Sequence, residues 1–347
     1  MSKFNWWMTA CALFLLWATT AVALPAQTFK TLHSFKGTDG QYPEAALIQG
    51  TNGKFYGTTY DGGANNLGTV FKITSSGTLT RLHSFDGTDG SLLIAGLVQA
   101  ANGDFYGTTF EGGASGNCRS GCGTIFKITP SGTLTTLHSF DNTDGSNPQG
   151  ALIQAKDGKF YGTTSGGGAN GFGTVFKITP GGTLTTLHAF DGTDGTLPYA
   201  GLVQAKDGNF YGTTEEGGAT GYGTVFEITP SGTLTTLHSF DVTDGATPVA
   251  ALVQATDGHF YGTTYYGGVN GDGTVFAITT SGTLTTLHSF DVTDGDNPYA
   301  AVVQAANGKF YGTTFLGGSS GACSGGCGTV FSLSVGDQSD RRRQGHL

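Results

Sequence analysis

The stretch SGTLTTLHSFDVTDG at Ser231–Gly245 returns letter for letter at Ser281–Gly295, and it decides the fold. Its central phrase LH(S/A)F occurs six times, with the histidines at His33, His83, His138, His188, His238 and His288. The steps between these histidines are 50, 55, 50, 50 and 50 residues, and an insertion in residues 106–123 explains the longer step. A fixed period of this size indicates a repeat architecture of six units.

Each unit predicts four short antiparallel strands. In the fifth unit these are Ala251–Ala255, Phe260–Tyr265, Thr274–Thr279 and Thr283–Phe290, separated by turn-forming glycines. Asp-Gly and Asn-Gly pairs between two such runs are strong hairpin signals. Apolar side chains fall on both sides of these strands, so we expect both faces of each sheet to be buried.

Six such sheets predict an all-β fold, a six-bladed β-propeller of four-stranded antiparallel blades. A parallel β-helix is the competing architecture, but its rungs are shorter and it needs atypical capping units at both ends. The phase of the repeat favours the propeller: the first unit begins with a fourth strand, residues 28–35, and the last stops after a third strand, residues 329–333. We therefore expect the N-terminal strand to complete the last blade and close the ring.

Three segments divide the chain. Residues 1–26 have the positive charge, apolar run and small-residue sites of a secretory signal peptide, with an uncleaved anchor helix as the alternative. Residues 27–335 hold the six-repeat domain, and residues 336–347 form a polar tail that we expect to be disordered. The prediction is a secreted or extracellular protein, with the periplasm as a further possibility, and no membrane span in the mature chain.

Four cysteines remain beyond the signal segment. They form two CxxxC pairs in glycine-rich loops, Cys118 with Cys122 and Cys323 with Cys327. An even number of cysteines suits an exported protein, so we expect one local disulfide in each loop. A metal shared by both pairs is the alternative, although the loops offer few other ligands.

Composition narrows the partners. The chain has 347 residues, a formal net charge of −9 and a sequence pI of about 5.2. Nucleic acids and anionic membrane surfaces need clustered Lys and Arg, so we expect neither as a partner. No motif calls for a cofactor, and we predict none.

The phrases FYGTT, GTVFxIT and GTLTTLHSF resemble the Gloeo/Verruco (GloVer) extracellular tandem repeat of bacterial exported proteins. The resemblance extends over nearly all of the predicted mature chain. It implies export and a propeller-like array of repeats. It supplies no catalytic residues that can be carried over to this sequence.

Two replicated features are candidates for chemistry. The histidine of LH(S/A)F lies between Leu and Phe, so we interpret it as a packed residue that bonds neighbouring backbone. The DxTDG turns, such as Asp241 to Gly245, carry paired carboxylates that we interpret as turn caps, with calcium binding as the alternative. We predict no metal site and no catalytic residue from either feature.

The residues before each Gly-Gly pair vary from unit to unit, while their surroundings are constant. Aromatic and acidic side chains here suit stacking on sugar rings and accepting hydroxyl hydrogens, with tolerated loop variation as the alternative. The candidate ligand-binding residues are Tyr60, Asp61, Phe110, Glu111, Glu215, Glu216, Tyr265, Tyr266 and Phe315. A second variable strip, Gln41 to Ala45 and its equivalents such as Thr196 to Ala200, is expected to border the same surface.

These features favour an exported, non-catalytic scaffold for extracellular binding or surface interaction, with a glycan or another surface protein as its partner. Near-identical repeats argue against one catalytic centre, because such a centre requires one blade to differ from the others. The alternatives are a secreted polysaccharide-active hydrolase or lyase on a propeller, and a purely structural module.

Overall fold

The computed structural model describes residues 29–335, and all regular secondary structure in this range is β-strand. The predicted signal peptide, residues 1–26, and the predicted tail, residues 336–347, lie outside the described residues. Within residues 29–335, the structure has no helix that is long and apolar enough to span a bilayer.

The strands form six sheets in chain order. The first three sheets are β1 (Ile48–Gln49), β2 (Phe55–Thr59), β3 (Thr69–Ile73) and β4 (Leu79–Ser84); β5 (Val98–Gln99), β6 (Phe105–Thr109), β7 (Thr124–Ile128) and β8 (Leu134–Ser139); and β9 (Ile153–Gln154), β10 (Phe160–Thr164), β11 (Thr174–Ile178) and β12 (Leu184–Ala189). The last three are β13 (Val203–Gln204), β14 (Phe210–Thr214), β15 (Thr224–Ile228) and β16 (Leu234–Ser239); β17 (Val253–Gln254), β18 (Phe260–Thr264), β19 (Thr274–Ile278) and β20 (Leu284–Ser289); and β21 (Val303–Gln304), β22 (Phe310–Thr313) and β23 (Val330–Leu333).

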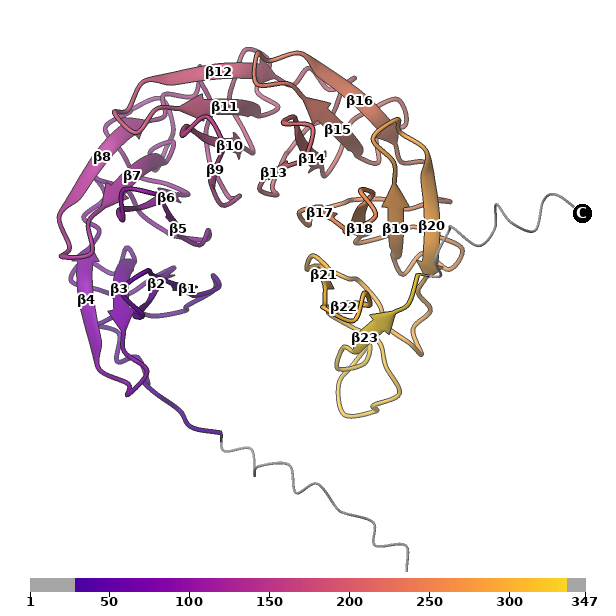
Figure 1. The fold of residues 1–347 in the computed structure, drawn as a ribbon, viewed down its shortest axis with the longest axis horizontal. Coiled ribbons are helices and arrows are strands. Elements are labelled where there is room, and N and C mark those ends of the chain that lie inside the picture. Colours follow the sequence, from indigo (N-terminus) through magenta and orange to yellow (C-terminus); the bar gives the residue numbers. More distant parts are fainter. Residues whose placement is uncertain (1–28, 336–347) are drawn as a thin grey trace, which may run out of the picture.

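These sheets are the blades of a six-bladed β-propeller, as predicted. Neighbouring strands are antiparallel, and the short first strands face the inside of the ring while the fourth strands form its outer rim (Figure 1). Five blades have four strands and the sixth has three. The ring is open between the first and last blades (Figure 1).

The fourth strands depart from the expectation of two buried faces. Thr285 and Thr286 of β20 are exposed on the outer rim. The register against β19 skips Leu287, because a β-bulge lies between Val275 and Phe276. The bulge explains why apolar residues do not alternate cleanly here: an extra residue re-aims the side chains that follow it.

Stacked aromatic rings join each blade to the next. The tyrosine of FYGTT stacks on the phenylalanine of FYGTT in the following blade, with ring centroids 4.0 to 4.1 Å apart. The five pairs are Tyr56–Phe105, Tyr106–Phe160, Tyr161–Phe210, Tyr211–Phe260 and Tyr261–Phe310. Such a pair adds roughly 0.5–1.5 kcal/mol beyond the burial of its area. The repeat therefore stabilises interfaces between blades as well as the blades themselves.

The glycine of FYGTT provides space within the blade. A Cβ on Gly212 would lie 2.6 Å from Cζ of Phe226 and 2.9 Å from Cδ2 of Leu202. Both neighbours belong to the buried core, so a side chain here would force them apart.

The two threonines of FYGTT form different hydrogen bonds. Thr214 Oγ1 lies 2.8 Å from Thr224 Oγ1 on the next strand of the same blade. Thr213 donates to the carbonyl oxygen of Ala250, 3.1 Å away, in the loop that enters the next blade. At the position equivalent to Thr213 in the second blade, the hydroxyl of Thr108 is buried without a hydrogen-bond partner.

The N-terminal segment was predicted to close the ring by completing the last blade, and in this structure it does not pair with that blade. Residues 29–35 form no strand, and the last sheet ends at β23. Phe29 is 96% exposed at one side of the gap, and Val330 on β23 is 81% exposed at the other.

Candidate functional site

Two sets of loops meet on one face of the ring, which we call the top face. They are the loops between the second and third strands of each blade and the loops that connect consecutive blades. One isolated antiparallel bridge joins the two loops in each blade. The bridges are Gln41–Asp61, Ser91–Glu111, Ser146–Gly166, Thr196–Glu216, Ala246–Tyr266 and Asp296–Leu316. The two variable strips of the sequence therefore border the same surface.

A left-handed residue fixes each connecting loop. Leu197 and Thr247 have φ values of 57° and 60°, a conformation that is costly for leucine and for a β-branched residue. The equivalent residues with positive φ are Tyr42, Leu92, Asn147 and Asn297. The carbonyl oxygen of Leu197 accepts a hydrogen bond of 3.1 Å from the amide of Glu215. The strained residue thereby holds the two loops against each other.

Glu215 is the chemically distinctive residue of this face. Burial raises the pKa of its carboxyl, the nearby charge of Glu216 raises it further, and a hydrogen bond with Tyr199 opposes the rise. Burial, the charge of Glu215 and the shared hydrogen bond raise the pKa of Tyr199. Tyr199 and Glu215 therefore lie close enough for the ionisation of each side chain to affect that of the other. Glu216 is exposed.

Three tyrosines from the fifth blade and the loop that enters the sixth form an aromatic group. The Tyr265 and Tyr266 rings lie edge to face with centroids 4.5 Å apart, and the Tyr265 and Tyr299 rings lie 5.9 Å apart. Burial raises the pKa of Tyr265, and the charge of Asp296 adds to the rise. Tyr299 also raises the pKa of Tyr199, which links this group to Glu215.

A second group lies on the first two blades. Burial raises the pKa of Tyr60, followed by the charges of Asp61, Glu111 and Glu44. This brings three of the predicted residues together with Glu44, the third acidic side chain of the group. Carboxyl groups and phenols are thus the ionisable neighbours that shift the pKa values on both sides of the top face.

The remaining predicted residues lie outside these groups. Phe315 is 66% exposed beside the open gap. The carbonyl oxygen of Phe110 accepts a hydrogen bond of 3.0 Å from the side chain of Asn147, so this segment has a structural role. Tyr199, Tyr299 and Glu44 were not named as candidates. Each lies in the second variable strip, directly after a proline, and that position was the available signal.

The six histidines have a partner that the sequence interpretation missed. Each ring Nε2 lies 2.6 to 2.9 Å from a carboxylate oxygen of the aspartate six residues later, rather than bonding backbone. The pairs are His33–Asp39, His83–Asp89, His138–Asp144, His188–Asp194, His238–Asp244 and His288–Asp294. The DxTDG turn reverses the chain, so its second aspartate returns to the preceding strand.

The first aspartate of DxTDG caps the turn, as interpreted from the sequence. Oδ1 of Asp241 accepts hydrogen bonds from the amide and hydroxyl of Thr243, at 3.0 and 2.6 Å. The hydroxyl bond is the main cause that lowers the pKa of Asp241. Protein donors therefore satisfy the carboxylates that a cation would need. Among residues 29–335, no group of three or more His, Cys, Asp or Glu side chains is arranged to hold a metal ion.

Both predicted disulfides are present. Cys118 is bonded to Cys122 and Cys323 to Cys327, with Cα atoms 5.2 and 5.3 Å apart. They lie within the long loops between the second and third strands of the second and sixth blades.

Solved structures share this fold at low sequence identity. A putative 6-phosphogluconolactonase from Bacteroides fragilis is 18% identical with a TM-score of 0.52, and 84% of each chain is covered. A putative 6-phosphogluconolactonase from Bacteroides uniformis is 16% identical with a TM-score of 0.51, and the match covers 78% of this chain and 77% of that one. The periplasmic gluconolactonase of Pseudomonas aeruginosa is 15% identical with a TM-score of 0.51, covering 84% and 88%.

These comparisons correct the functional expectation. The prediction of a non-catalytic scaffold is wrong on this finding, because these three propellers are described as enzymes. The alternative of an enzyme on a propeller agrees better. The error has a physical reason: packing residues are nearly identical in all blades and dominate the repeat, whereas the residues that differ between blades lie on the top face.

No curated protein matches the chain. A family model described as the Gloeobacter/Verrucomicrobia repeat matches residues 19–206 and again residues 155–341, which together include most of the sequence. Repeats of this kind were expected from FYGTT and GTVFxIT. The chain therefore belongs to the Gloeobacter/Verrucomicrobia repeat family.

Proposed function

We propose that the protein is an exported hydrolase of neutral sugar lactones, with Glu215 as its general base. The observation that carries this proposal is the half-buried Glu215 carboxyl, whose pKa is raised and whose neighbour across the two loops is the Tyr199 phenol. One blade departs from the others here, as a single catalytic centre requires. The equivalent residues of the other blades are Tyr60, Phe110, Ser165, Tyr265 and Phe315.

The proposed reaction is the opening of a lactone ring by water. The Glu215 carboxylate takes a proton from a water molecule as the water oxygen bonds to the lactone carbonyl carbon. The tetrahedral intermediate then breaks the bond to the ring oxygen, which receives that proton back from Glu215. A raised pKa brings the carboxylate closer to the operating pH and makes it a stronger base. Tyr199 is a positioning residue that orients the carboxylate.

The surroundings of Glu215 favour a neutral, sugar-derived substrate. Tyr265, Tyr266 and Tyr299 offer ring faces and edges for the C–H groups of a pyranose or furanose. The acidic neighbours Glu216 and Asp296 oppose the approach of an anion. We therefore propose an unphosphorylated lactone, in line with the description of the Pseudomonas aeruginosa propeller rather than the two Bacteroides ones.

The proposed location is outside the cytoplasm. The predicted signal peptide, residues 1–26, supports this, and so do the two disulfides, which form and persist in oxidising compartments.

The test measures acid release from glucono-1,5-lactone and from its 6-phosphate above the spontaneous rate, with residues 27–347 of the wild type. We expect turnover of the neutral lactone, and a loss of about 10²–10⁴-fold in kcat for Glu215→Gln. The matched control is Glu227→Gln, on β15 away from the top face, which should keep wild-type activity. A wild type that does not exceed the spontaneous rate, or an equally active Glu215→Gln, would overturn the proposal.

A further inference from the structure

Five interfaces between blades are built alike, and the sixth is incomplete. At each of the five, a glutamine side-chain oxygen accepts a hydrogen bond of 2.9 to 3.2 Å from a backbone amide of the preceding blade, beside the tyrosine–phenylalanine stack. The corresponding stack at the sixth would join Tyr311 of β22 to Phe55 of β2. These two strands lie on opposite sides of the gap (Figure 1).

The end of the segment at residues 29–35 already makes a contact typical of a fourth strand with the blade that follows it. The Phe35 ring lies 5.2 Å from the Phe71 ring of the first blade, edge to face. In the next interface, Phe85 at the end of a fourth strand lies 5.3 Å from Phe126 in the same arrangement. The segment is therefore placed against the first blade as every other fourth strand is placed against the blade that follows it. What is missing is its pairing with a third strand.

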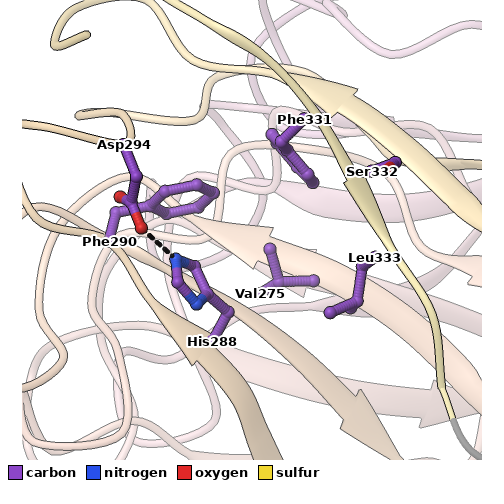
Figure 2. A pocket seen from close by; sticks show the side chains of 7 residues that line it. All are labelled: Val275, His288, Phe290, Asp294, Phe331, Ser332 and Leu333. Carbon is purple, nitrogen blue, oxygen red and sulfur yellow. Dashed lines mark hydrogen bonds and ion pairs between the residues drawn. The ribbon is translucent and has the colours of Figure 1, made fainter. Parts of the chain in front are cut away.

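A cavity of about 190 Å³ beside β23 marks the missing partner. Figure 2 shows that apolar side chains from the fifth and sixth blades line it, together with the His288–Asp294 pair. The four main apolar residues are Val275, Phe290, Phe331 and Leu333.

The preceding interface shows what fills the equivalent space. There, the residues at the same repeat positions, Val225, Phe240, Phe276 and Ile278, form one core cluster, and Leu284 packs against it. Leu284 is the first residue of its fourth strand, four residues before the histidine. The residue four positions before His33 is Phe29, whose ring is exposed.

We propose that residues 29–35 are the fourth strand of the last blade and that Phe29 fills this cavity. The register follows from the pairing of β19 with β20: Phe29 lies opposite Leu333, Lys30 opposite Ser332, and Thr31 opposite Phe331. The bulge then places His33 opposite Val330. Docking the strand closes the ring, because the same segment is already packed on the first blade. The closure does not depend on the proposed catalytic role.

Closure also joins the two halves of the top face. In the fifth interface, the side chain of Asn297 donates to the carbonyl oxygen of Tyr265, and the Tyr299 ring packs near Tyr265. The equivalents across the gap are Tyr42 and Glu44, opposite Phe315. The ring closure thus brings Glu44 of the acidic group beside Phe315 of the last blade.

The occupant is the chain's own strand rather than that of a second copy. Phe35 packs on Phe71 of the first blade, so the segment stays tethered to the molecule that contains β23. A tethered strand has an effective concentration in the millimolar range, far above that of a second molecule in dilute solution.

A designed disulfide tests the register. Paired residues of antiparallel strands have Cα atoms about 4.5–5.5 Å apart, which suits a disulfide. The test variant is Lys30→Cys/Ser332→Cys, and its matched control in the complete fifth blade is Ala277→Cys/Thr285→Cys. We expect peptide mapping of monomeric protein to find the new crosslink in both. A control crosslink without the test crosslink, or a test crosslink between two chains, would overturn the proposal.

A second measurement needs no cysteines. Phe29→Ala should lower the melting temperature by several degrees if the ring is buried. Phe29→Leu introduces the leucine that the other fourth strands have at this position, and its melting temperature should be close to that of the wild type. An exposed Phe29 would give no change for either variant. That outcome would overturn the closure and leave the proposed lactonase activity untouched.

Discussion

The packing around Gly212 predicts whether a substitution there raises or lowers the stability of the protein. We expect Gly212→Ala to destabilise the protein, because the new Cβ would lie 2.6 Å from Cζ of Phe226 and 2.9 Å from Cδ2 of Leu202. Phe226 is fully buried and packs edge to face on Phe190, 5.4 Å away, so its ring has little room to move. Overpacking of this kind costs about 1–3 kcal/mol.

An opposing effect must be subtracted. Replacing glycine by alanine restricts the unfolded chain and stabilises by about 0.4–1 kcal/mol where the native conformation tolerates it. The net expectation for Gly212→Ala is a loss of roughly 0–2.6 kcal/mol, centred on about 1.3 kcal/mol. The control is Gly181→Ala in a surface turn, where the nearest atom is Thr179 Oγ1 at 3.8 Å, so the unfolded-state effect should act alone and stabilise slightly.

The assay is guanidinium unfolding of both variants and the wild type, followed by circular dichroism. Circular dichroism is the suitable probe because all three tryptophans lie in residues 1–26, outside the chain of residues 27–347 that is assayed. The midpoints should move in opposite directions at constant slope. If Gly212→Ala is as stable as the wild type, the lack of space for a Cβ does not explain why every FYGTT phrase has a glycine at this position.

Three further predictions follow from single contacts. Thr108→Val should be neutral or stabilising, because its buried hydroxyl has no partner, whereas Thr163→Val loses a 3.0 Å bond to Ala200 and should cost about 1 kcal/mol in chemical unfolding; equal losses would contradict this. Glu215→Gln should raise the melting temperature at pH 7. The raised pKa of Glu215 means that the folded state binds the proton more tightly than the unfolded state, so the stability of the wild type falls as the pH rises above 4.5, the ordinary pKa of glutamate. The difference in melting temperature between the variant and the wild type should vanish below pH 4.5. Replacing Cys118 and Cys122 by Ser should cost less than the roughly 3 kcal/mol of a fifteen-residue loop, because this ring is much shorter, and a larger loss in thermal unfolding would show that the disulfide supports the blade.

Much of the fold was predictable because it repeats. The period of the LH(S/A)F phrase and the turn glycines predicted six sheets of four strands. The bulge beside Val275 was not predictable, because one extra residue in a strand leaves no mark on composition. The sequence contained both members of each histidine–aspartate pair, but their contact depends on the full reversal of the chain within DxTDG.

The site was predictable in part. Glu215 and Glu216 were named because they vary where their neighbours do not. Tyr199 lies in a different loop, and the two loops meet through the Thr196–Glu216 bridge and the bond from the Glu215 amide to Leu197, which no local pattern indicates. Burial of a carboxyl by residues of another loop changes its pKa, and this can be known only once the loops are placed.

The letter-for-letter identity of Ser231–Gly245 and Ser281–Gly295 has a consequence for how the chain reaches its native state. The strands β16 and β20 that these stretches form are interchangeable in sequence, and their partners β15 and β19 differ at one residue, Glu227 or Ala277. A newly synthesised chain can therefore pair β15 with β20, omit a blade, and gain almost the same local energy. The native arrangement is more stable because the mispaired chain leaves the strands and loops between β15 and β20 without their packing partners. We therefore expect slow refolding phases in which misassembled blades rearrange.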